Sequence, residues 1–500
     1  MIRIISTTNY LFLTYVILIK TIFLHSYIFA INNENYSKSL LVDVKKISGQ
    51  MVLDGALDEA QWKKAQAIEN FLEFKPGDNV SPPKKTKAMV LYDEENLYVG
   101  FIAEDDPSEI RATIQKRDLA WQDDWVAIIL DTYGDANSSV MIASNPLGMQ
   151  IDGLNKADGS DDPSYDIVYK SYGMITDEGY QVEMAIPFSS LSFPKQDIQN
   201  WKVTFYRNMP RDVRHQINWG GLDRKDPCWI CQMGTMTGIK NISQKGKIEF
   251  LPSIVGSRST NLDENERYLP NQDNSELSLG LKYSLSSDLA LEFSLNPDFS
   301  QIESDVEQIN INSTFAINFP EKRPFFNEGS DLTNMWINTI YTRSINNPSI
   351  VGRVINRGQD SNWSFISAHD ESTPFIVPSE EKSTSALGGK SISNIFRYKR
   401  PLNLGSHVGL ALTDRRMLDG QGSGSTLSFD SRYRFNDAYQ IEFQTVFSYT
   451  KEPDDSELLL SDIVFGEGYT KTFDGESFTG DAMELELSRR TEHWNLELGY

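Results

Sequence analysis

The side chains best suited to recognition chemistry gather in one short segment, RDLAWQDDW, at positions 117–125. Sugars present apolar C–H faces and polar rims, so a carbohydrate site combines exposed aromatic rings with carboxylate, amide or guanidinium groups. This segment holds both kinds of group within nine residues, and we predict a carbohydrate contact there. The candidates that it supplies are Arg117, Trp121, Asp124 and Trp125.

Strands that follow this segment offer further polar partners, namely Asn145, Asp152 and Tyr165. The two tryptophans are not equivalent. Trp121 lies in a polar loop, where a large aromatic ring has little structural reason to be, so we favour it as a ligand contact. Trp125 begins a strongly apolar strand and is explained equally well as a core residue.

A candidate calcium loop follows in KADGSDDPSYD, where the closely spaced carboxylates are Asp158, Asp161 and Asp162. Calcium prefers oxygen ligands, but the segment lacks the glutamate that closes an EF-hand loop at its twelfth position. A solvated acidic turn is therefore the favoured interpretation. We expect no cofactor, with calcium as the one candidate.

The only cysteines, Cys228 and Cys231, stand in DPCWICQMG. A redox C-x-x-C site needs a helix N-terminus to stabilise the thiolate, and the flanking residues suggest a strand or loop. The pair also lacks the companion ligands of a zinc site. The sequence favours a structural disulfide or two free thiols.

Catalytic motifs are not recognisable in the chain, which has no G-x-S-x-G elbow, H-E-x-x-H pair or phosphate loop. Glycoside hydrolysis needs two carboxylates held across the bond, and an acidic chain offers many pairs with nothing to single one out. The histidines are scattered. We name no catalytic residue.

The elements that must position these residues are short strands with Gly, Asp and Asn between them, beginning with the alternating run at 86–103. Few helical patterns interrupt them, which favours an antiparallel β-sandwich. Before the first strands, Trp62 belongs to a short helical segment, and core packing is its favoured role.

From Lys247 onward the alternation changes character, because long runs such as 275–285 and 289–295 place leucines on one face and small or charged residues on the other. Aromatic residues recur near strand ends. These features predict about ten to twelve strands of a transmembrane β-barrel. A soluble β-sandwich would also alternate and remains the alternative. Tyr500 is either a cut end or the aromatic last residue of a barrel strand.

The stretch 296–330 fits neither pattern, being acidic in its first half and basic-aromatic in its second. Such a segment would be costly to expose to lipid, so we expect it in the barrel lumen or at its mouth.

Two motifs in this stretch, NPDFSQIESD and FPEKRPFFNEGSD, closely resemble the hallmark of the domain-of-unknown-function 5916 family. Upstream, the order LDGALDEAQW, LYDEENLYVGF, QDDWVAIILD, SNPLG and MAIPFSSL resembles the family-9 carbohydrate-binding module, a DOMON-like sandwich. The first resemblance implies a Gram-negative outer-membrane protein that couples such a domain to a barrel. The second implies glycan binding between two tryptophan rings, which we do not match residue by residue.

The first thirty residues carry an early arginine and two apolar runs, which predicts a signal peptide, with an uncleaved anchor as the alternative. A net charge of -23 argues against nucleic acid, which requires a basic surface. The expected organisation is a signal peptide over 1–30, a linker over 31–46, a β-sandwich over 47–240 and an outer-membrane β-barrel over 241–500.

The function predicted from these features is an outer-membrane β-barrel protein whose periplasmic domain binds carbohydrate for glycan capture or uptake. Its partners would be a carbohydrate ligand and outer-membrane lipid, without nucleic acid. An enzyme is the alternative, either a hydrolase of O-glycosyl bonds or a hydrolase-associated binding protein in carbohydrate catabolism. A third alternative is an assembly component whose binding face is vestigial.

Overall fold

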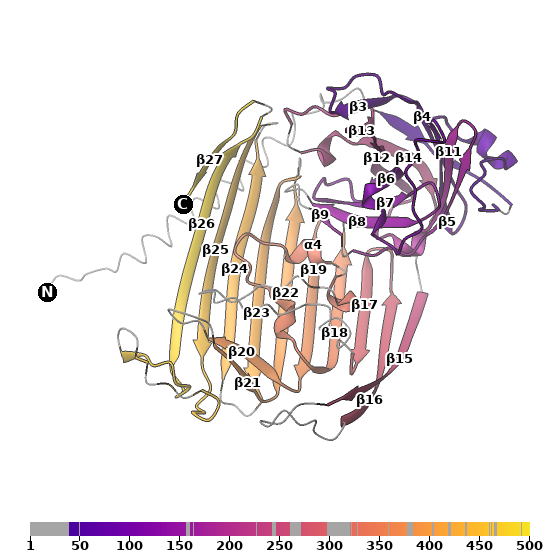
Figure 1. Ribbon diagram of the computed structural model, residues 1–500. Helices are drawn as coiled ribbons and strands as arrows, with labels where there is room; N and C mark the ends of the chain where they lie inside the picture. The colour runs from indigo at the N-terminus through magenta and orange to yellow at the C-terminus, as the bar shows by residue number, and fades with distance from the viewer. Residues whose placement is uncertain are drawn as a thin grey trace. The chain divides into compact units, whose positions relative to one another are not determined.

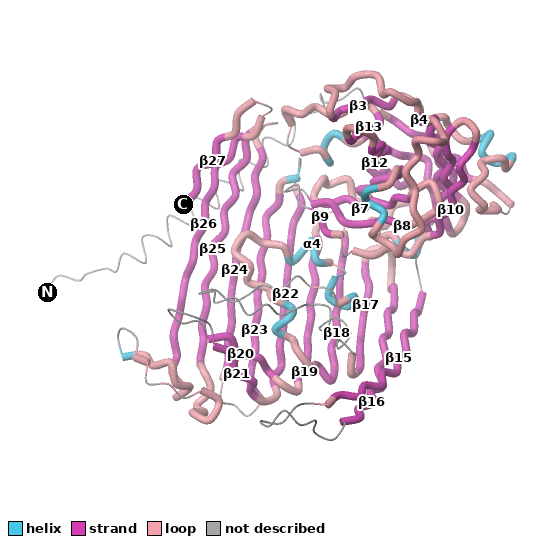
Figure 2. Tube along the Cα trace, in the orientation of Figure 1, coloured by secondary structure: helices cyan, strands magenta, loops and turns pink. Residues whose placement is uncertain are grey.

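The structure of the chain is a computed structural model that describes residues 40–49, 51–156, 161–163, 165–226, 228–242, 247–260, 272–297, 321, 323–327, 329–358, 360–377, 384–402, 405–418, 422–435, 438–459, 461, 463–464, 468–491 and 493–500. This part of the chain is nearly all β (Figure 2), which confirms the predicted fold class. The predicted signal peptide, 1–30, and Asp158 lie outside the described residues. In the described ranges, no helix is both long and apolar enough to cross a membrane.

Two sheets build the N-terminal half (Figure 1). The larger runs in the order β1 (Leu41–Asp43), β14 (Gly234–Lys240), β12 (Ile198–Pro210), β6 (Trp125–Asp131), β7 (Ser138–Ser144), β8 (Gln150–Lys156) and β9 (Asp161–Asp162), with β13 (Arg214–Trp219) pairing β12 and β3 (Phe71–Lys75). The smaller runs β10 (Lys170–Thr176), β11 (Gly179–Pro187), β5 (Asn96–Glu104), β4 (Thr86–Tyr92) and β2 (Lys45–Lys46). Short 3-10 turns are η1 (Ala60–Lys64), η2 (Ala120–Gln122), η3 (Phe188–Ser190) and η4 (Ile230–Gln232).

The first two strands fall within 31–46, the segment predicted as a linker. β1 pairs in parallel with β14 and β2 in parallel with β4, so the sandwich includes residues from 41 onward. The other pairs in both sheets are antiparallel, as the sequence predicted.

The core lies between the two sheets, where side chains at alternate strand positions meet. Phe101 of β5 and Phe205 of β12 make an edge-to-face contact across this core, with ring centroids 6.1 Å apart. Trp62 is also buried, as predicted, at 4% exposure. Apolar burial of this kind supplies most of the stabilisation of a sandwich.

Four charged residues form a buried network at one end of this core. Arg207 donates to Asp105 at 2.6 Å, and Arg211 donates to the same carboxylate at 2.5 Å and to Asp124 at 2.9 Å. Their charges sum to zero. A buried charge is tolerated only when it is paired and hydrogen-bonded, so these four residues depend on one another.

A single buried glutamate anchors the N-terminal motif LDGALDEAQW. Glu183 of β11 accepts hydrogen bonds from the backbone N–H groups of Asp54 and Gly55 and from Nε1 of Trp62, at 2.9 to 3.1 Å. Burial raises the pKa of Glu183 to about 7, although these three donors act in the opposite direction.

This pKa predicts a pH-dependent stability. Between about pH 4.5 and 7 the folded protein retains a proton on Glu183 that the unfolded chain has released, so stability from this group falls as pH rises. We expect the melting temperature of the wild type, relative to Glu183→Gln, to decrease across this window. A constant difference in melting temperature from pH 4.5 to 8 would contradict the assignment.

The C-terminal half is dominated by one antiparallel sheet of eleven strands (Figure 1). Its order is β15 (Lys247–Ser259), β16 (Gln272–Ser284), β17 (Leu289–Leu295), β18 (Pro348–Arg357), β19 (Asn362–Asp370), β22 (Ser391–Pro401), β23 (His407–Met417), β24 (Ser423–Arg434), β25 (Tyr439–Lys451), β26 (Ser477–Arg489) and β27 (Leu496–Gly499). A separate hairpin joins β20 (Thr373–Val377) to β21 (Thr384–Gly388), and the short helical elements are α3 (Pro324–Asn327), α4 (Ser330–Thr333) and η5 (Thr342–Ser344).

The two faces of this sheet have opposite polarity. The exposed apolar residues include Ile254, Leu277, Leu291, Phe293, Phe365, Leu412, Phe429, Ile441, Phe447 and Leu485. The buried polar residues include Ser278, Glu292, Arg353, Ser364, Ser393, Arg397, Ser428, Asp430 and Gln444. Along β24, for example, exposed Phe429 lies between buried Ser428 and Asp430. The sheet therefore exposes large apolar side chains on one face and buries polar side chains, together with a smaller apolar cluster, on the other.

A segment at 329–347 lies on the polar face. Arg397 Nε donates to the carbonyl of Leu332 at 2.7 Å, and Gln444 accepts the N–H of Ile337 at 2.7 Å. Phe326, just before this segment, packs with Ile345 against apolar residues of the same face. Of the stretch 296–330 predicted to occupy a lumen or mouth, residues 298–320, 322 and 328 lie outside the described part.

Candidate functional site

Arg117 is the centre of the candidate site in the sandwich. It lies in the loop between β5 and β6, and its guanidinium contacts Asp152 of β8 through two bonds, from Nε at 2.8 Å and from Nη2 at 2.5 Å. Asp166 lies 3.1 Å and Asp118 3.8 Å from Nε of Arg117. The sequence named Arg117 and Asp152 from different elements, and the structure brings them together.

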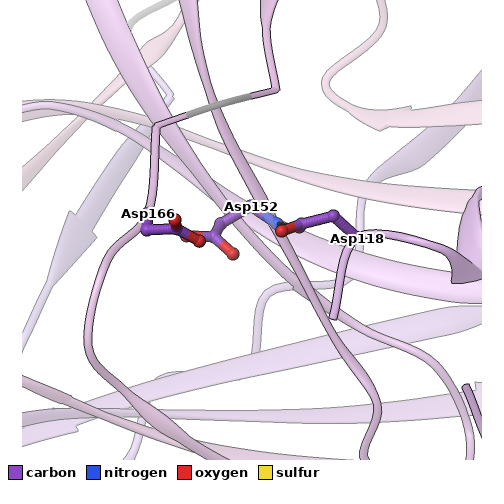
Figure 3. A group of neighbouring side chains, drawn as sticks. All are labelled: Asp118, Asp152 and Asp166. Carbon is purple, nitrogen blue, oxygen red and sulfur yellow. Dashed lines mark hydrogen bonds between the residues drawn. The ribbon is translucent and has the colours of Figure 1, made fainter. Parts of the chain in front are cut away.

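The three carboxylates converge on one another as well (Figure 3). Asp118 has a positive φ of 63°, and its Oδ1 accepts the N–H of Asp152 at 2.9 Å. Burial raises the pKa of Asp152 to about 6 and also raises the pKa of Asp118. A carboxylate set of this size could hold a divalent cation. Here Arg117 already contacts all three carboxylates, and a calcium ion would have to displace the guanidinium.

The acidic residues predicted as calcium ligands are arranged differently. Asp161 and Asp162 form the short strand β9. Asp161 accepts a hydrogen bond from Nδ2 of Asn155 at 2.6 Å, and Asp162 lies 3.5 Å from Nζ of Lys156. Neither belongs to the carboxylate group around Arg117, so the calcium candidates and the convergent carboxylates are different residues.

Asp124 immediately precedes β6, and Trp125 is the first residue of that strand. Asp124 is fully buried in the ion network with Arg211. Trp125 is 3% exposed and stacks on Tyr206 with ring centroids 5.1 Å apart. Both side chains have structural partners, and a ligand could reach either one only after a local rearrangement.

Asn145 is also fully buried and organises its own turn. Its Oδ1 accepts the N–H groups of Leu147 and Met149, both at 2.9 Å, and its Nδ2 donates to Asp123 at 3.0 Å. Tyr165 is partly exposed in the loop after β9, and its N–H donates to the carbonyl of Asp162 at 3.5 Å. The predicted set thus divides into Arg117 with Asp152, a group of buried structural residues, and the more accessible Trp121 and Tyr165.

Trp121 occupies η2, where its ring is half-buried and perpendicular to that of Trp125 at 6.0 Å. Trp229 lies half-buried against the same hydrophobic cluster, beside a disulfide between Cys228 and Cys231. The sequence interpretation treated Trp229 only as a neighbour of the cysteines. The sequence feature that could have identified Trp229 as a ligand contact is its position in a polar, Asp-containing loop. Trp121 and Trp229 are the two partly exposed indoles that pack on this cluster.

Comparison with known proteins agrees with the order of the two halves. Residues 53–214 match the family described as carbohydrate family 9 binding domain-like, and residues 249–364 match the domain of unknown function DUF5916. This is the order expected from the sequence. A search of curated proteins finds no match.

Among solved structures, a putative carbohydrate-binding protein from Bacteroides uniformis ATCC 8492 is 15% identical, covering 40% of this chain and 99% of that chain with a TM-score of 0.33. A carbohydrate binding module of family 9 from Caldicellulosiruptor kristjanssonii, in complex with cellotriose, is 16% identical over 39% of this chain and 92% of that chain, with a TM-score of 0.28. The CymD monoaromatic hydrocarbon channel is 7% identical over 86% and 87%, with a TM-score of 0.19.

Proposed function

We propose that this chain, which joins a carbohydrate family 9 binding domain-like region to a DUF5916 region, is an outer-membrane protein that captures glycans. In this proposal the sandwich binds carbohydrate on the periplasmic side. The eleven-stranded sheet forms the wall of a transmembrane β-barrel, and binding serves glycan capture or uptake.

The observation that carries the binding proposal is the pair of partly exposed indoles, Trp121 and Trp229, on one cluster within the sandwich. Each ring can stack on the apolar face of a sugar without first leaving a core. Arg117 and Asp152 are less suited to direct contact because they already satisfy one another. We therefore assign stacking to the indoles and a loop-positioning role to the Arg117 group.

The membrane proposal is supported by the polarity of the large sheet. A soluble sandwich would bury its apolar row, whereas here Phe365, Leu412 and Phe429 are each about 40% exposed. The opposite face buries Arg397 and Ser428 completely. An apolar exterior with a polar interior is the arrangement expected of strands that face hydrocarbon on one side and water on the other.

Replacing Trp121 with Ala is expected to weaken glycan binding by about fivefold or more, because the loss of a stacked aromatic contact at the centre of a site costs about 1 kcal/mol or more. Trp229→Ala should weaken it as well. The measurement is isothermal titration calorimetry of the full chain in detergent, with glucose and cello-oligosaccharides as ligands.

The matched control is Tyr172→Ala, because Tyr172 is 45% exposed on β10, in the other sheet. It should bind as the wild type does. Equal affinities for all three variants would remove the indoles from the site. Absence of binding by the wild type to a broad glycan panel would refute the proposed function itself.

A further inference from the structure

A cavity of about 880 Å³ lies at one end of the large sheet. Its walls come from the ends of β22 to β25, from the chain between β25 and β26, and from residues 339–345. This is the end at which β22, β24 and β26 begin, opposite the end at which β15 begins (Figure 1). Small-molecule sites typically have about 300–1,000 Å³, so the cavity can hold a ligand of one or two rings.

Arg415 is a hydrogen-bond donor in the lining of this cavity. It lies on the polar face of β23, where its Nε donates to Oγ of Ser393 at 2.9 Å and its Nη2 donates to the carbonyl and Oγ of Ser344, at 2.9 and 2.8 Å. All three acceptors are neutral. Within the described ranges, no carboxylate forms an ion pair with this guanidinium, and Nη1 makes no hydrogen bond. Asp370 interacts with Arg415 only at longer range, and its carboxylate accepts the N–H groups of Asn346 and Asn347.

Other arginines on the same face differ from Arg415 because they form ion pairs. Each of four has a carboxylate partner: Arg353 with Glu292, Arg357 with Asp331, Arg397 with Asp430 and Arg432 with Glu442. A cation in a partly enclosed site needs a counter-charge. Arg415 is held in place by serine and backbone oxygens, with part of its donor fork left for an anion.

Aromatic side chains form another part of the cavity wall. Phe375 and Phe473 make an edge-to-face contact at 5.4 Å, and Tyr341 lines the same cavity. Three acidic residues also line the cavity, namely Asp414, Glu452 and Glu476, together with Lys451 and Lys471. Each carboxylate has a partner: Asp414 pairs with Arg416, Glu452 accepts the N–H groups of Asp474 and Glu476 at 3.1 and 3.3 Å, and Glu476 accepts the N–H of Thr470 at 3.2 Å. The cavity therefore has both a guanidinium and aromatic side chains in its lining.

We propose that this cavity binds a small organic anion whose carboxylate pairs with Arg415 and whose ring packs against the aromatic wall. A carboxylate matches the planar fork of a guanidinium. Two classes of molecule share this chemistry, namely sugar acids and aromatic carboxylates. The site is separate from the indoles of the sandwich, and its occupation does not require that the sandwich bind glycan.

The test is calorimetric titration of the full chain in detergent with D-glucuronate and with benzoate, and with D-glucose and inorganic sulfate for comparison. At least one of the two carboxylates should bind more tightly than glucose and sulfate. Arg415→Gln should weaken that binding by roughly thirtyfold or more, as expected when one partner of an enclosed charge pair is removed. Arg415→Lys should lie between the two, since it keeps the charge and loses the fork.

The matched control is Arg400→Gln, near the end of β22, because Arg400 is exposed and does not line the cavity. It should bind as the wild type does. Should Arg415→Gln not fold, phenylglyoxal modification of the wild type provides a second test: the bound carboxylate should slow modification of Arg415 and leave that of Arg400 unchanged. Equal binding by Arg415→Gln, sulfate binding as tight as that of the carboxylates, or no protection of Arg415 would overturn the proposal.

Discussion

Replacing Arg207 with Ala is expected to lower the free energy of unfolding of the sandwich by about 3–5 kcal/mol, because it leaves a buried carboxylate without its full counter-charge. Arg207 and Asp105 are both enclosed in the core, with side chains 0% and 1% exposed. Arg211 would remain to neutralise both Asp105 and Asp124. One guanidinium would then serve two buried carboxylates, which leaves a net negative charge in the core.

The measurement is denaturant unfolding followed by tryptophan fluorescence. Six of the nine tryptophans lie before residue 241, so the signal reports mainly on the sandwich. Arg224→Ala is the matched control, because Arg224 is exposed in a loop and such substitutions usually change stability by less than about 0.5 kcal/mol. A loss for Arg207→Ala no larger than for Arg224→Ala would show that the network contributes little.

A double replacement separates the charge effect from the loss of packing. In Asp105→Leu with Arg207→Met, both charges are removed and Arg211 remains paired with Asp124. Replacement of a whole buried ion pair by apolar residues is often neutral or stabilising. We therefore expect the double variant to be more stable than Arg207→Ala alone, although it carries more substitutions.

The general architecture was readable from the sequence because strand alternation is local. Leu277, Leu291 and Phe293 were assigned to the outward row from spacing alone, and they are exposed in the structure. Burial of Trp62 followed from its helical neighbours in the same way. By contrast β1 and β2 have only three and two residues, too few to show a period, and they pair with strands distant in sequence.

The spacing of residues in the sequence does not determine which side chains of the candidate site are accessible or which partners they have. Whether Trp125 or Trp121 is accessible is decided by which loops cover β6, and those loops include the one that carries Trp229, about a hundred residues later. The partner of Asp124 is Arg211, 87 residues away. Residue type indicated what each side chain could do, whereas tertiary contacts decide which of them are free to do it.

Replacing Leu412 with Arg is expected to cost about 2–4 kcal/mol of stability in a lipid bilayer, the cost typical of a cation on the lipid face at the midplane of a barrel. Leu412 is the central residue of β23 and is 41% exposed on the apolar face. If this face contacted water instead, a charge there would change stability by less than about 0.5 kcal/mol. Reversible denaturant titration of the chain in liposomes measures the difference.

Ile441→Arg is the control that tests whether the cost depends on position along the strand. Ile441 is the third residue of β25, on the same face and 37% exposed, and its cross-strand neighbours Tyr433 and Leu487 carry no charge. An arginine near a membrane interface should cost only about 0–1 kcal/mol. Equal and small effects at both positions would mean that water meets the apolar row, and the membrane proposal would then fail. A large effect at Leu412 alone has a simple physical cause, because only a hydrocarbon layer makes the cost of one charge depend on its position along a strand.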